Sequence, residues 1–586
     1  HRISSSLHDL LDHESPEIRR KALVILGRDP SRLDAERVAR RLRDPARQVR
    51  EEAVKGLVAA RADKATLIRE LLGSDHADVR TATLACLARG ELEAADGSML
   101  GQTYLEERWD RAQRGDRDAR IELALAAGAL RGDPLAAELL EPLVGDPDPA
   151  VASAALRSAG MLRRRDLYPA MIAALRSPAT REAAREALAE QGALAVDTLA
   201  DYLMDERGHP VIRRHVPSVL ARIADQRAVN VMLHSVVAPE TDQLLDYRTL
   251  KALTKLRLRE PSLEFSTREV LRSVEREVHA AERYDRARRC LQRIGADGRS
   301  ARLLRTALDE ARMQRQEGVF RLLGLLYDPE EMYRCQLALI AGERAAVGNA
   351  LEWLEETLGR ALFEKLKPLL EARPPAPPLP DPARSVGPLL SDGDPWIARL
   401  AVAAVGEMDA DWSRNALRGI IASGTTPELR DLARRLSGGT PLDHTGGQRP
   451  MDLIEKVFLL QRIDLLQDAR SAHLALLASI AEEVDVDRGT TLIRRDEPTD
   501  ALYVVIEGDV RLDGVGDQRI DLDPGQAFGT WALIDEAPSL MAATALSDAR
   551  LLRITRADFH DLLADHSELA LGLLQGLARR VRTLVA

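Results

Sequence analysis

Residues that could do chemistry on their own are sparse in this chain. The cysteines Cys86, Cys290 and Cys335 lie far apart, and no CxxC or Cys/His ligand spacing joins them. The histidines are scattered, and the close pair His209 and His215 lacks the i, i+4 spacing that places two metal ligands on one helix face. No GxSxG, GxxxxGKS/T or HExxH motif occurs. We therefore expect no metal site, no disulfide framework and no catalysis.

Three short basic runs, 163–165, 213–215 and 288–289, could in principle bind phosphate. They fall on expected helices of a chain with 83 Lys and Arg, 93 Asp and Glu and a net charge of −10. A solvated helix face or an ion pair between repeats is the more frequent origin of such runs. An acidic chain also has no general attraction to nucleic acid, so we expect no nucleic-acid partner.

The helices that carry these residues repeat along the chain. The apolar anchors Ile18, Val49 and Val79 are each followed by arginine, and they are spaced 31 and 30 residues apart. Units at 139–156 and 386–402 keep the same order of helix, Asp-Pro turn and helix. Each helix has an apolar stripe that it cannot bury alone, so stacked pairs are expected. The pattern resembles HEAT repeats, which implies an α-solenoid; a non-repetitive helical bundle is the alternative.

Two segments with the composition of linkers divide the chain of 586 residues. The run 374–382 has six prolines in nine residues and predicts an extended spacer, whereas the Gly-rich run 437–450 predicts a joint that lets the following domain reorient. After Pro450, and from Val484 above all, short strands with Gly, Asp and Pro turns replace the helical period. We expect a mostly α chain with a HEAT-like array at 1–373, a Pro-rich linker at 374–382, a HEAT-like segment at 383–436, a flexible linker at 437–450 and an α+β domain at 451–586, its strands at about 484–555 and its last helices at 556–586.

Short blocks in the α+β domain keep the order and spacing of a known family. They are Ala501–Val505, Gly508–Val510, Pro524–Gly525, Phe528–Gly529 and Leu551–Ile554. Over about 451–586 the sequence resembles the cyclic-nucleotide-binding domain, which implies a β-roll with a short helical phosphate cassette after the Phe-Gly pair. The resemblance places the cassette and its pocket at Phe528, Gly529, Thr530, Trp531, Ala532, Leu533, Ser539, Leu540, Met541 and Ala542.

The cassette departs from the family at both of its ligand-binding positions. The resemblance implies a Glu that holds the ribose hydroxyl and, just after a Pro, an Arg that holds the cyclic phosphate. Here Thr530 follows the Phe-Gly pair and Ser539 follows Pro538. A charge-assisted hydrogen bond contributes roughly 1.5–3 kcal/mol, so its loss costs at least about an order of magnitude in affinity.

Two replacements for the lost clamp stay open. Backbone N–H groups at the start of the cassette helix could hold an anion, or Arg495 or Arg519 could reach it. The opposite interpretation is a packed β-roll whose pocket is degenerate or filled by Trp531, Leu540 and Met541. We expect the degenerate pocket, with no cofactor and with cyclic nucleotide disfavoured.

A second resemblance concerns 318–334, 349–355 and 454–460. These segments are similar to the soluble tails of some bacterial relatives of ATP/ADP translocases, in which a transporter domain precedes HEAT repeats and a cyclic-nucleotide-binding-like domain. The resemblance implies a membrane domain upstream of His1 and a cytoplasmic array tethered to the inner face of a membrane. No window approaches 18 consecutive apolar residues, so we expect no bilayer insertion of this segment itself.

Two functions remain open at this point. The first is a non-enzymatic scaffold, the soluble arm of a larger protein, that binds a protein partner or a second copy of itself. The second is a regulatory module that responds to a cyclic or other nucleotide. Thr530 and Ser539 favour the first, because neither can replace the charged groups that a nucleotide needs.

Overall fold

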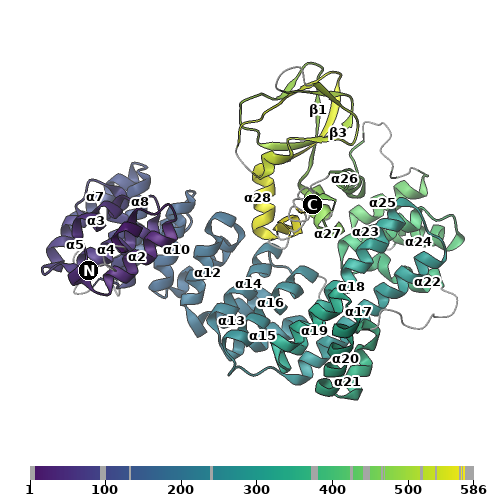
Figure 1. Ribbon diagram of the computed structural model, residues 1–586, viewed down its shortest axis with the longest axis horizontal. Helices are drawn as coiled ribbons and strands as arrows, with labels where there is room; N and C mark the ends of the chain where they lie inside the picture. Colours follow the sequence, from purple (N-terminus) through teal and green to yellow (C-terminus); the bar gives the residue numbers. More distant parts are fainter. Residues whose placement is uncertain are drawn as a thin grey trace. The chain divides into compact units, whose positions relative to one another are not determined.

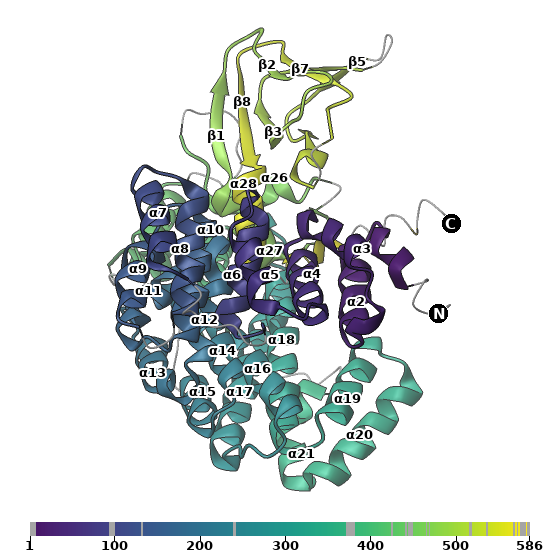
Figure 2. The ribbon, with the colours of Figure 1, turned by 90° about the vertical axis from the view of Figure 1, so that its left-hand side faces the viewer.

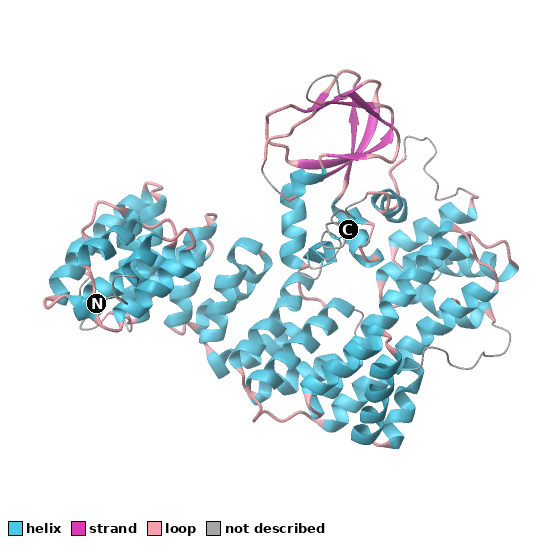
Figure 3. Ribbon diagram, viewed as in Figure 1, coloured by secondary structure: helices cyan, strands magenta, loops and turns pink. Residues whose placement is uncertain are grey.

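A computed structural model shows two compact units (Figure 1). The model describes residues 7–574 and 582, except for 93–99, 131–132, 238–241, 371–380, 423–425, 440–441, 443–448, 464–465, 468, 515–518, 535–536, 567–568 and 571. Unit 1 comprises 1–232 and 259–264, and unit 2 comprises 233–258 and 265–586. Helices dominate both units, and the strands of the described chain all lie in the C-terminal part of unit 2 (Figure 3).

In its described part, unit 1 consists of short helices. Its α-helices are α2 (Pro16–Gly27), α3 (Ala35–Arg40), α4 (Arg47–Ala60), α5 (Lys64–Leu72), α6 (Ala77–Arg89), α7 (Gln102–Gln113), α8 (Arg117–Ala129), α9 (Leu135–Val144), α10 (Pro149–Met161), α11 (Tyr168–Ala173), α12 (Pro178–Glu190), α13 (Val196–Met204) and α14 (Pro210–Ile223). Single 3₁₀ turns are η1 (Leu10–Asp12), η2 (Pro30–Arg32), η3 (Arg41–Arg43), η5 (Arg165–Leu167), η6 (Ala174–Arg176) and η7 (Gly192–Ala195). The next helix, α15 (Gln226–Val237), crosses the boundary between the units.

The second helix of each pair forms a continuous row in unit 1. Helices α2, α4, α6, α8, α10, α12 and α14 each pack against the next, and α3, α5, α7, α9, α11 and α13 pack on that row. The anchors Val49, Val79 and Val151 are buried, while Ile18 is half-buried. The stacked helical pairs that the sequence predicts are therefore present.

The arginine after each anchor has a structural role that the repeat pattern alone does not reveal. Arg19, Arg50 and Arg80 are buried, and each donates from Nη1 to a carbonyl just beyond the end of the preceding helix. The acceptors are the carbonyl oxygens of His13 at 2.8 Å, Asp44 at 2.7 Å and Ser74 at 2.6 Å. Carbonyls at helix ends lack partners within the helix, so the guanidinium satisfies acceptors that the helix leaves unpaired.

The same arginines also connect each repeat to the next one. Arg19 meets Asp44 at 2.8 Å, Arg50 meets Asp78 at 3.0 Å and Arg80 meets Glu122 at 2.6 Å. In the run 213–215, Arg213 does not lie on a solvated face: it is buried and donates to the Leu203 carbonyl at 3.0 and 3.1 Å. These side chains fasten the row through polar bonds as well as through apolar packing.

Unit 2 begins with helices of unequal length, two of which have 27 and 28 residues. They are α16 (Gln243–Arg259), α17 (Thr267–Arg293), α18 (Arg299–Leu326), α19 (Pro329–Ala341), α20 (Arg344–Leu358), α21 (Arg360–Leu370), α22 (Pro382–Ser385), α23 (Pro395–Gly406), α24 (Asp411–Ala422) and α25 (Pro427–Ser437), with the 3₁₀ turn η8 (Gly387–Ser391). Helices α17 and α18 pack along each other, and α23 packs on α18 (Figure 1). The long hairpin forms the centre of the helical part of this unit.

The C-terminal part of unit 2 is a small roll of two four-stranded sheets. Its elements are α26 (Leu453–Leu460), α27 (Ser471–Ile480), β1 (Glu482–Val486), β2 (Thr491–Ile493), β3 (Ala501–Glu507), β4 (Val510–Asp513), β5 (Arg519–Leu522), β6 (Ala527–Phe528), η10 (Thr530–Leu533), β7 (Ala542–Ala545), β8 (Ala549–Thr555) and α28 (Arg556–Asp565). One sheet has the order β1-β8-β3-β6 and the other the order β2-β7-β4-β5. The consecutive strands β3 and β4, which the sequence predicts on either side of Gly508, thus belong to different sheets. Gly508 has φ 84°, a left-handed conformation that suits this crossing.

Most of each expected linker lies outside the described residues. Of the Pro-rich run only Asp381 and Pro382 are described, as the N-cap and first residue of α22. Among the described residues no helix combines the length and apolar character needed to cross a bilayer.

Candidate functional site

The expected cassette is a single 3₁₀ turn, η10, between β6 and β7. Gly529 precedes the turn with φ 73°, and a Cβ there would lie 2.5 Å from the Ala501 carbonyl oxygen. Only glycine fits this position without displacing β3. The Phe-Gly pair therefore sets the direction in which the chain leaves the roll and enters the cassette.

Ser539 uses its hydroxyl locally. Its Oγ donates to the Met541 carbonyl at 2.7 Å, and its backbone N–H donates to the Glu497 carbonyl at 2.9 Å. The Asp496 N–H in turn donates to the Ser539 carbonyl at 2.8 Å. Ser539 is thereby part of a backbone pairing that closes the cassette, and its side chain supplies no positive charge.

The two arginines that could replace the clamp are engaged at the end of β4. Arg495 donates to the carbonyls of Asp513, at 2.9 Å, and Gly514. Arg519 forms an ion pair with the Asp513 carboxylate at 3.4 Å. Both guanidinium groups are therefore held by the residues that end β4.

The expectation that Trp531, Leu540 and Met541 fill the interior of the roll is wrong for the first two. Trp531 is 64% exposed and Leu540 is 74% exposed, while Met541 is half-buried. The cassette turn instead buries Ala532 and Leu533, so its other side faces solvent. A turn of only four residues cannot direct both sides inward.

The interior of the roll is filled by side chains from its own strands. The buried apolar residues are Ile493, Val505, Val510, Leu522, Phe528, Ala543, Ala549 and Leu551. Tyr503 and Phe528 stack across neighbouring strands with ring centroids 5.2 Å apart, and burial raises the pKa of Tyr503. Apart from Phe528, the sequence analysis did not identify these residues as the core of the roll, although the apolar residues along β3 were an available signal.

Two side chains of α28 donate hydrogen bonds to carbonyl groups of the cassette. Arg556 donates from Nε to the Ala532 carbonyl at 2.5 Å and from Nη2 to the Thr499 carbonyl at 2.5 Å. His560 donates from Nε2 to the Leu533 carbonyl at 3.0 Å. A change in the shape of η10 would therefore alter the hydrogen bonds made by the first residues of α28.

The helices that precede the roll are fastened to the helical part of unit 2. Glu310 of α18 accepts hydrogen bonds from the Ser471 backbone N–H, at 3.0 and 3.1 Å, and from its Oγ at 2.6 Å, so it caps α27 from another element. Trp396 of α23 donates from Nε1 to the same Ser471 Oγ at 3.3 Å. Burial raises the pKa of Glu310, and the bonds from Ser471 oppose that rise.

Charged contacts fasten α26 in the same way. Arg399 of α23 pairs with Asp452 at 2.7 Å, and Arg435 of α25 pairs with Glu455 at 2.6 Å. Burial opposes ionisation of Glu455, but the guanidinium groups of Arg449 and Arg435 hold its pKa below the ordinary value. These contacts count against the free reorientation of the roll predicted from the Gly-rich linker.

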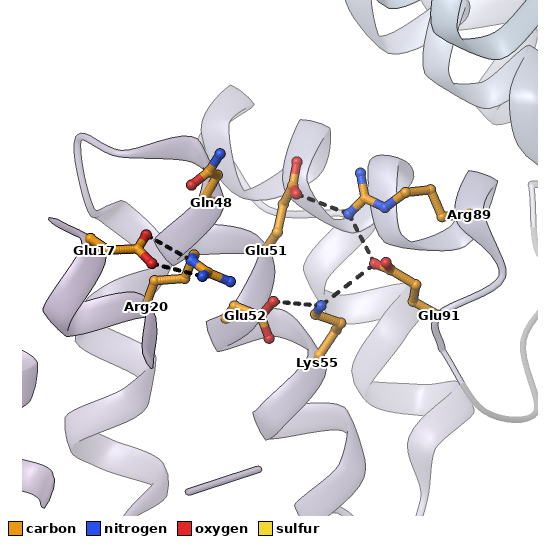
Figure 4. A pocket seen from close by; sticks show the side chains of 8 residues that line it. All are labelled: Glu17, Arg20, Gln48, Glu51, Glu52, Lys55, Arg89 and Glu91. Atoms are coloured by element: carbon orange, nitrogen blue, oxygen red, sulfur yellow. Dashed lines mark hydrogen bonds and ion pairs between the residues drawn. The ribbon is translucent and has the colours of Figure 1, made fainter. Parts of the chain in front are cut away.

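A concave site lies in unit 1, on α2, α4, α6 and the residues just after α6 (Figure 4). It is an open cleft of about 490 Å³ lined by Glu17, Arg20, Gln48, Glu51, Glu52, Lys55, Arg89 and Glu91. Its cations already have partners: Arg20 meets Glu17 at 2.9 Å, Lys55 meets Glu52 at 2.7 Å, and Arg89 meets Glu51 and Glu91 at 2.9 Å each. A wall of paired opposite charges suits a polar protein surface better than a single small ion.

Comparisons with known proteins concern the C-terminal part of the chain. Residues 483–566 match the family model of the cyclic nucleotide-binding domain. A CRP-like cAMP-activated global transcriptional regulator of Mycobacterium tuberculosis is 30% identical over 129 residues, which cover 21% of this chain and 58% of the regulator. A cyclic nucleotide-gated potassium channel of Mesorhizobium japonicum is 29% identical over 119 residues, which cover 20% of this chain and 33% of the channel. The chain therefore spans less than two thirds of either relative.

Two further likenesses complete this picture. A lysophospholipase of Kluyveromyces lactis is 26% identical over 137 residues, which cover 22% of this chain but only 10% of the enzyme. Among solved structures, the N-terminal domain of a transcriptional regulator from Streptomyces coelicolor A3(2) shares 32% identity, covers 22% of this chain and 94% of that chain, and has a TM-score of 0.20. By sequence, the similarity to cyclic nucleotide-binding domains lies in the C-terminal part of this mostly helical chain, at 483–566.

Proposed function

We propose that this chain is a non-enzymatic binding protein: a HEAT-like helical scaffold whose C-terminal domain keeps the cyclic-nucleotide-binding fold without its phosphate clamp. The observation that carries the proposal is Ser539, whose hydroxyl bonds to the Met541 carbonyl at the position where the family resemblance expects an arginine. Arg495 and Arg519 are both engaged by residues at the end of β4, so neither supplies the missing guanidinium.

The row of second helices in unit 1 supports the scaffold function. Rows of stacked helical pairs present long, continuous faces, and such faces usually bind other proteins. The cleft on α2, α4 and α6, with its paired charges, is one candidate contact for a protein partner. In this proposal the chain needs no cofactor, and the translocase-like membrane tether upstream of His1 stays a prediction.

A nucleotide-responsive module is the second candidate. It is favoured by the family match over 483–566 and by relatives whose names state activation by cAMP or gating by cyclic nucleotides. In that case Arg556 and His560 would convey a change at the cassette to α28. The ligand would then have to be held by backbone N–H groups, since Thr530 and Ser539 carry no charge.

Calorimetry with cyclic AMP and cyclic GMP separates the two candidates. We expect no tight binding to the wild-type chain, and micromolar affinity would overturn the scaffold proposal in favour of the second candidate. The double variant Thr530→Glu, Ser539→Arg should gain affinity, because it restores the two charged groups that the family resemblance expects at the cassette. The matched control Thr530→Glu, Ser539→Lys keeps the charge but lacks the planar fork, and it should gain less.

A further inference from the structure

Helix α19 has two apolar faces. One face is satisfied within unit 2, where Met332 and Cys335 are buried. The opposite face exposes Tyr333 by 58%, Leu337 by 46% and Ile340 by 65%. A surface helix of a globular protein normally has one apolar stripe and a polar outer face, so the second stripe needs a partner.

The spacing of this second stripe is that of a helix-packing seam. Tyr333, Leu337 and Ile340 are separated by four and three residues, the alternation that keeps side chains aligned along one side of a helix. The helix is well defined at both ends, because the Asp328 carboxylate accepts from the Glu330 and Glu331 N–H groups and Gly342 ends it with φ 69°. Figure 2 shows α19 beside α20, which begins at Arg344 directly after this turn.

Opposite charges lie near the two ends of this stripe. Glu330 lies three residues before Tyr333 on α19, and Arg344 is the first residue of α20, beyond the Gly342 turn; both residues are exposed. Glu330 has Arg334 at 3.9 Å, a distance that leaves its carboxylate available for a closer cation. A partner with the same stripe in a parallel orientation would bring like charges together, whereas an antiparallel one would place each glutamate beside an arginine.

We propose that α19 is a self-association surface, on which a second copy of this chain packs its own α19 antiparallel about a two-fold axis. Tyr333, Leu337 and Ile340 of the two copies form the apolar centre, and two symmetric Glu330–Arg344 pairs flank it. An isologous contact of this kind needs a surface that complements itself, and apolar residues between opposite charges provide one. The proposal is independent of whether the roll binds nucleotide.

The oligomeric state of the full chain tests the surface directly. Sedimentation velocity of the wild type should show a dimer that dissociates on dilution, and Leu337→Glu and Ile340→Glu should each give a monomer. Leu194→Glu, at an isolated apolar residue that is 45% exposed in unit 1, is the matched control and should leave the dimer unchanged. A wild type that stays monomeric at the highest concentration reached, or dimers that persist in both α19 variants, would overturn the proposal.

Charge reversal tests the antiparallel orientation. Glu330→Arg alone and Arg344→Glu alone should each weaken the dimer by about tenfold, because both flanking pairs become repulsive. An equimolar mixture of these two variants should recover wild-type affinity, since both pairs become attractive again in the mixed dimer, and so should the double variant in one chain. A mixture no tighter than the single variants would contradict the antiparallel pairing, as would dimerisation that ignores these charges.

Discussion

Unit 1 and the roll differ in their use of arginine. In unit 1 buried arginines stabilise the fold, whereas the cassette of the roll lacks the arginine that the family resemblance expects. In unit 1, Arg80 is buried, donates to the Ser74 carbonyl and pairs with Glu122 at 2.6 Å. In the roll, Ser539 stands where the family resemblance expects an arginine, and its hydroxyl is satisfied by a neighbouring carbonyl. The partners of Arg80 belong to the chain, so its loss would leave buried groups unpaired. The partner of a phosphate clamp belongs to the ligand, so the clamp can be lost without damage to the fold.

The largest loss of stability is expected from a change in the row of packed second helices of unit 1. Val49→Asp places a carboxylate at a fully buried position and should destabilise unit 1 by more than about 4 kcal/mol. Hydrogen exchange should show loss of protection in α4 and α6 while α17 and α18 keep theirs, because they belong to the other unit. Ile25→Asp, at a position that is 47% exposed, is the control. Simultaneous loss of protection in both units would show that the units do not fold separately.

Removal of a buried arginine should destabilise unit 1 somewhat less than Val49→Asp does. Arg80→Ala leaves the Ser74 carbonyl without its donor and Glu122 with Arg108, at 2.9 Å, as its remaining cation, so we expect a loss of about 3 kcal/mol. Arg114→Ala, at an exposed position in the same unit, should change stability by less than about 0.5 kcal/mol. Equal unfolding midpoints in urea for the two variants would show that Arg80 contributes no more to stability than an exposed arginine does.

The junction between the roll and the helices should show two opposite pH dependences. The pKa of Glu310 is raised, so its contribution to stability is present below its ordinary pKa and is lost as the pH rises through the raised pKa. The pKa of Glu455 is lowered, so its contribution is present above its ordinary pKa and is lost as the pH falls through the lowered one. Glu310→Gln and Glu455→Gln should remove these two dependences, each about 1 kcal/mol in size.

Urea unfolding followed over a pH series measures both effects. Glu352→Gln, at an exposed position on α20, is the control for a lost charge and should keep the wild-type profile. If both junction variants also keep the wild-type profile, the roll is not fastened through Ser471 and Glu455.

The smallest effect is expected at the surface of the cassette. Trp531→Ala should change the stability of unit 2 by less than about 0.5 kcal/mol, because the ring is 64% exposed. Phe528→Ala, in the filled interior, should cost about 3 kcal/mol and serves as the positive control. A Trp531→Ala loss as large as that of Phe528→Ala would place the tryptophan inside the pocket after all.

Local patterns account for what could be predicted from the sequence. Apolar anchors at a regular spacing predict the stacked pairs, because burial of a stripe depends on residues a few positions apart. The Gly and Pro turns after Val484 predict strands, and the Phe-Gly pair predicts the cassette. The polar partners of Arg80 and the cap from Glu310 onto Ser471 could not be predicted, since these contacts join residues 42 and 161 positions apart.

The sequence by itself determined the order of the elements, the change from helices to strands and the missing charge at Ser539, because each follows from residue types at short range. Only the tertiary structure decided that the chain divides near Met232, that α26 and α27 pack on α18, α23 and α25, and that Trp531 and Leu540 face outward. The same holds for the second apolar stripe of α19, since an apolar residue in a sequence does not reveal whether another element covers it. Coverage depends on which distant helices meet, and that is settled by the packing of the whole unit.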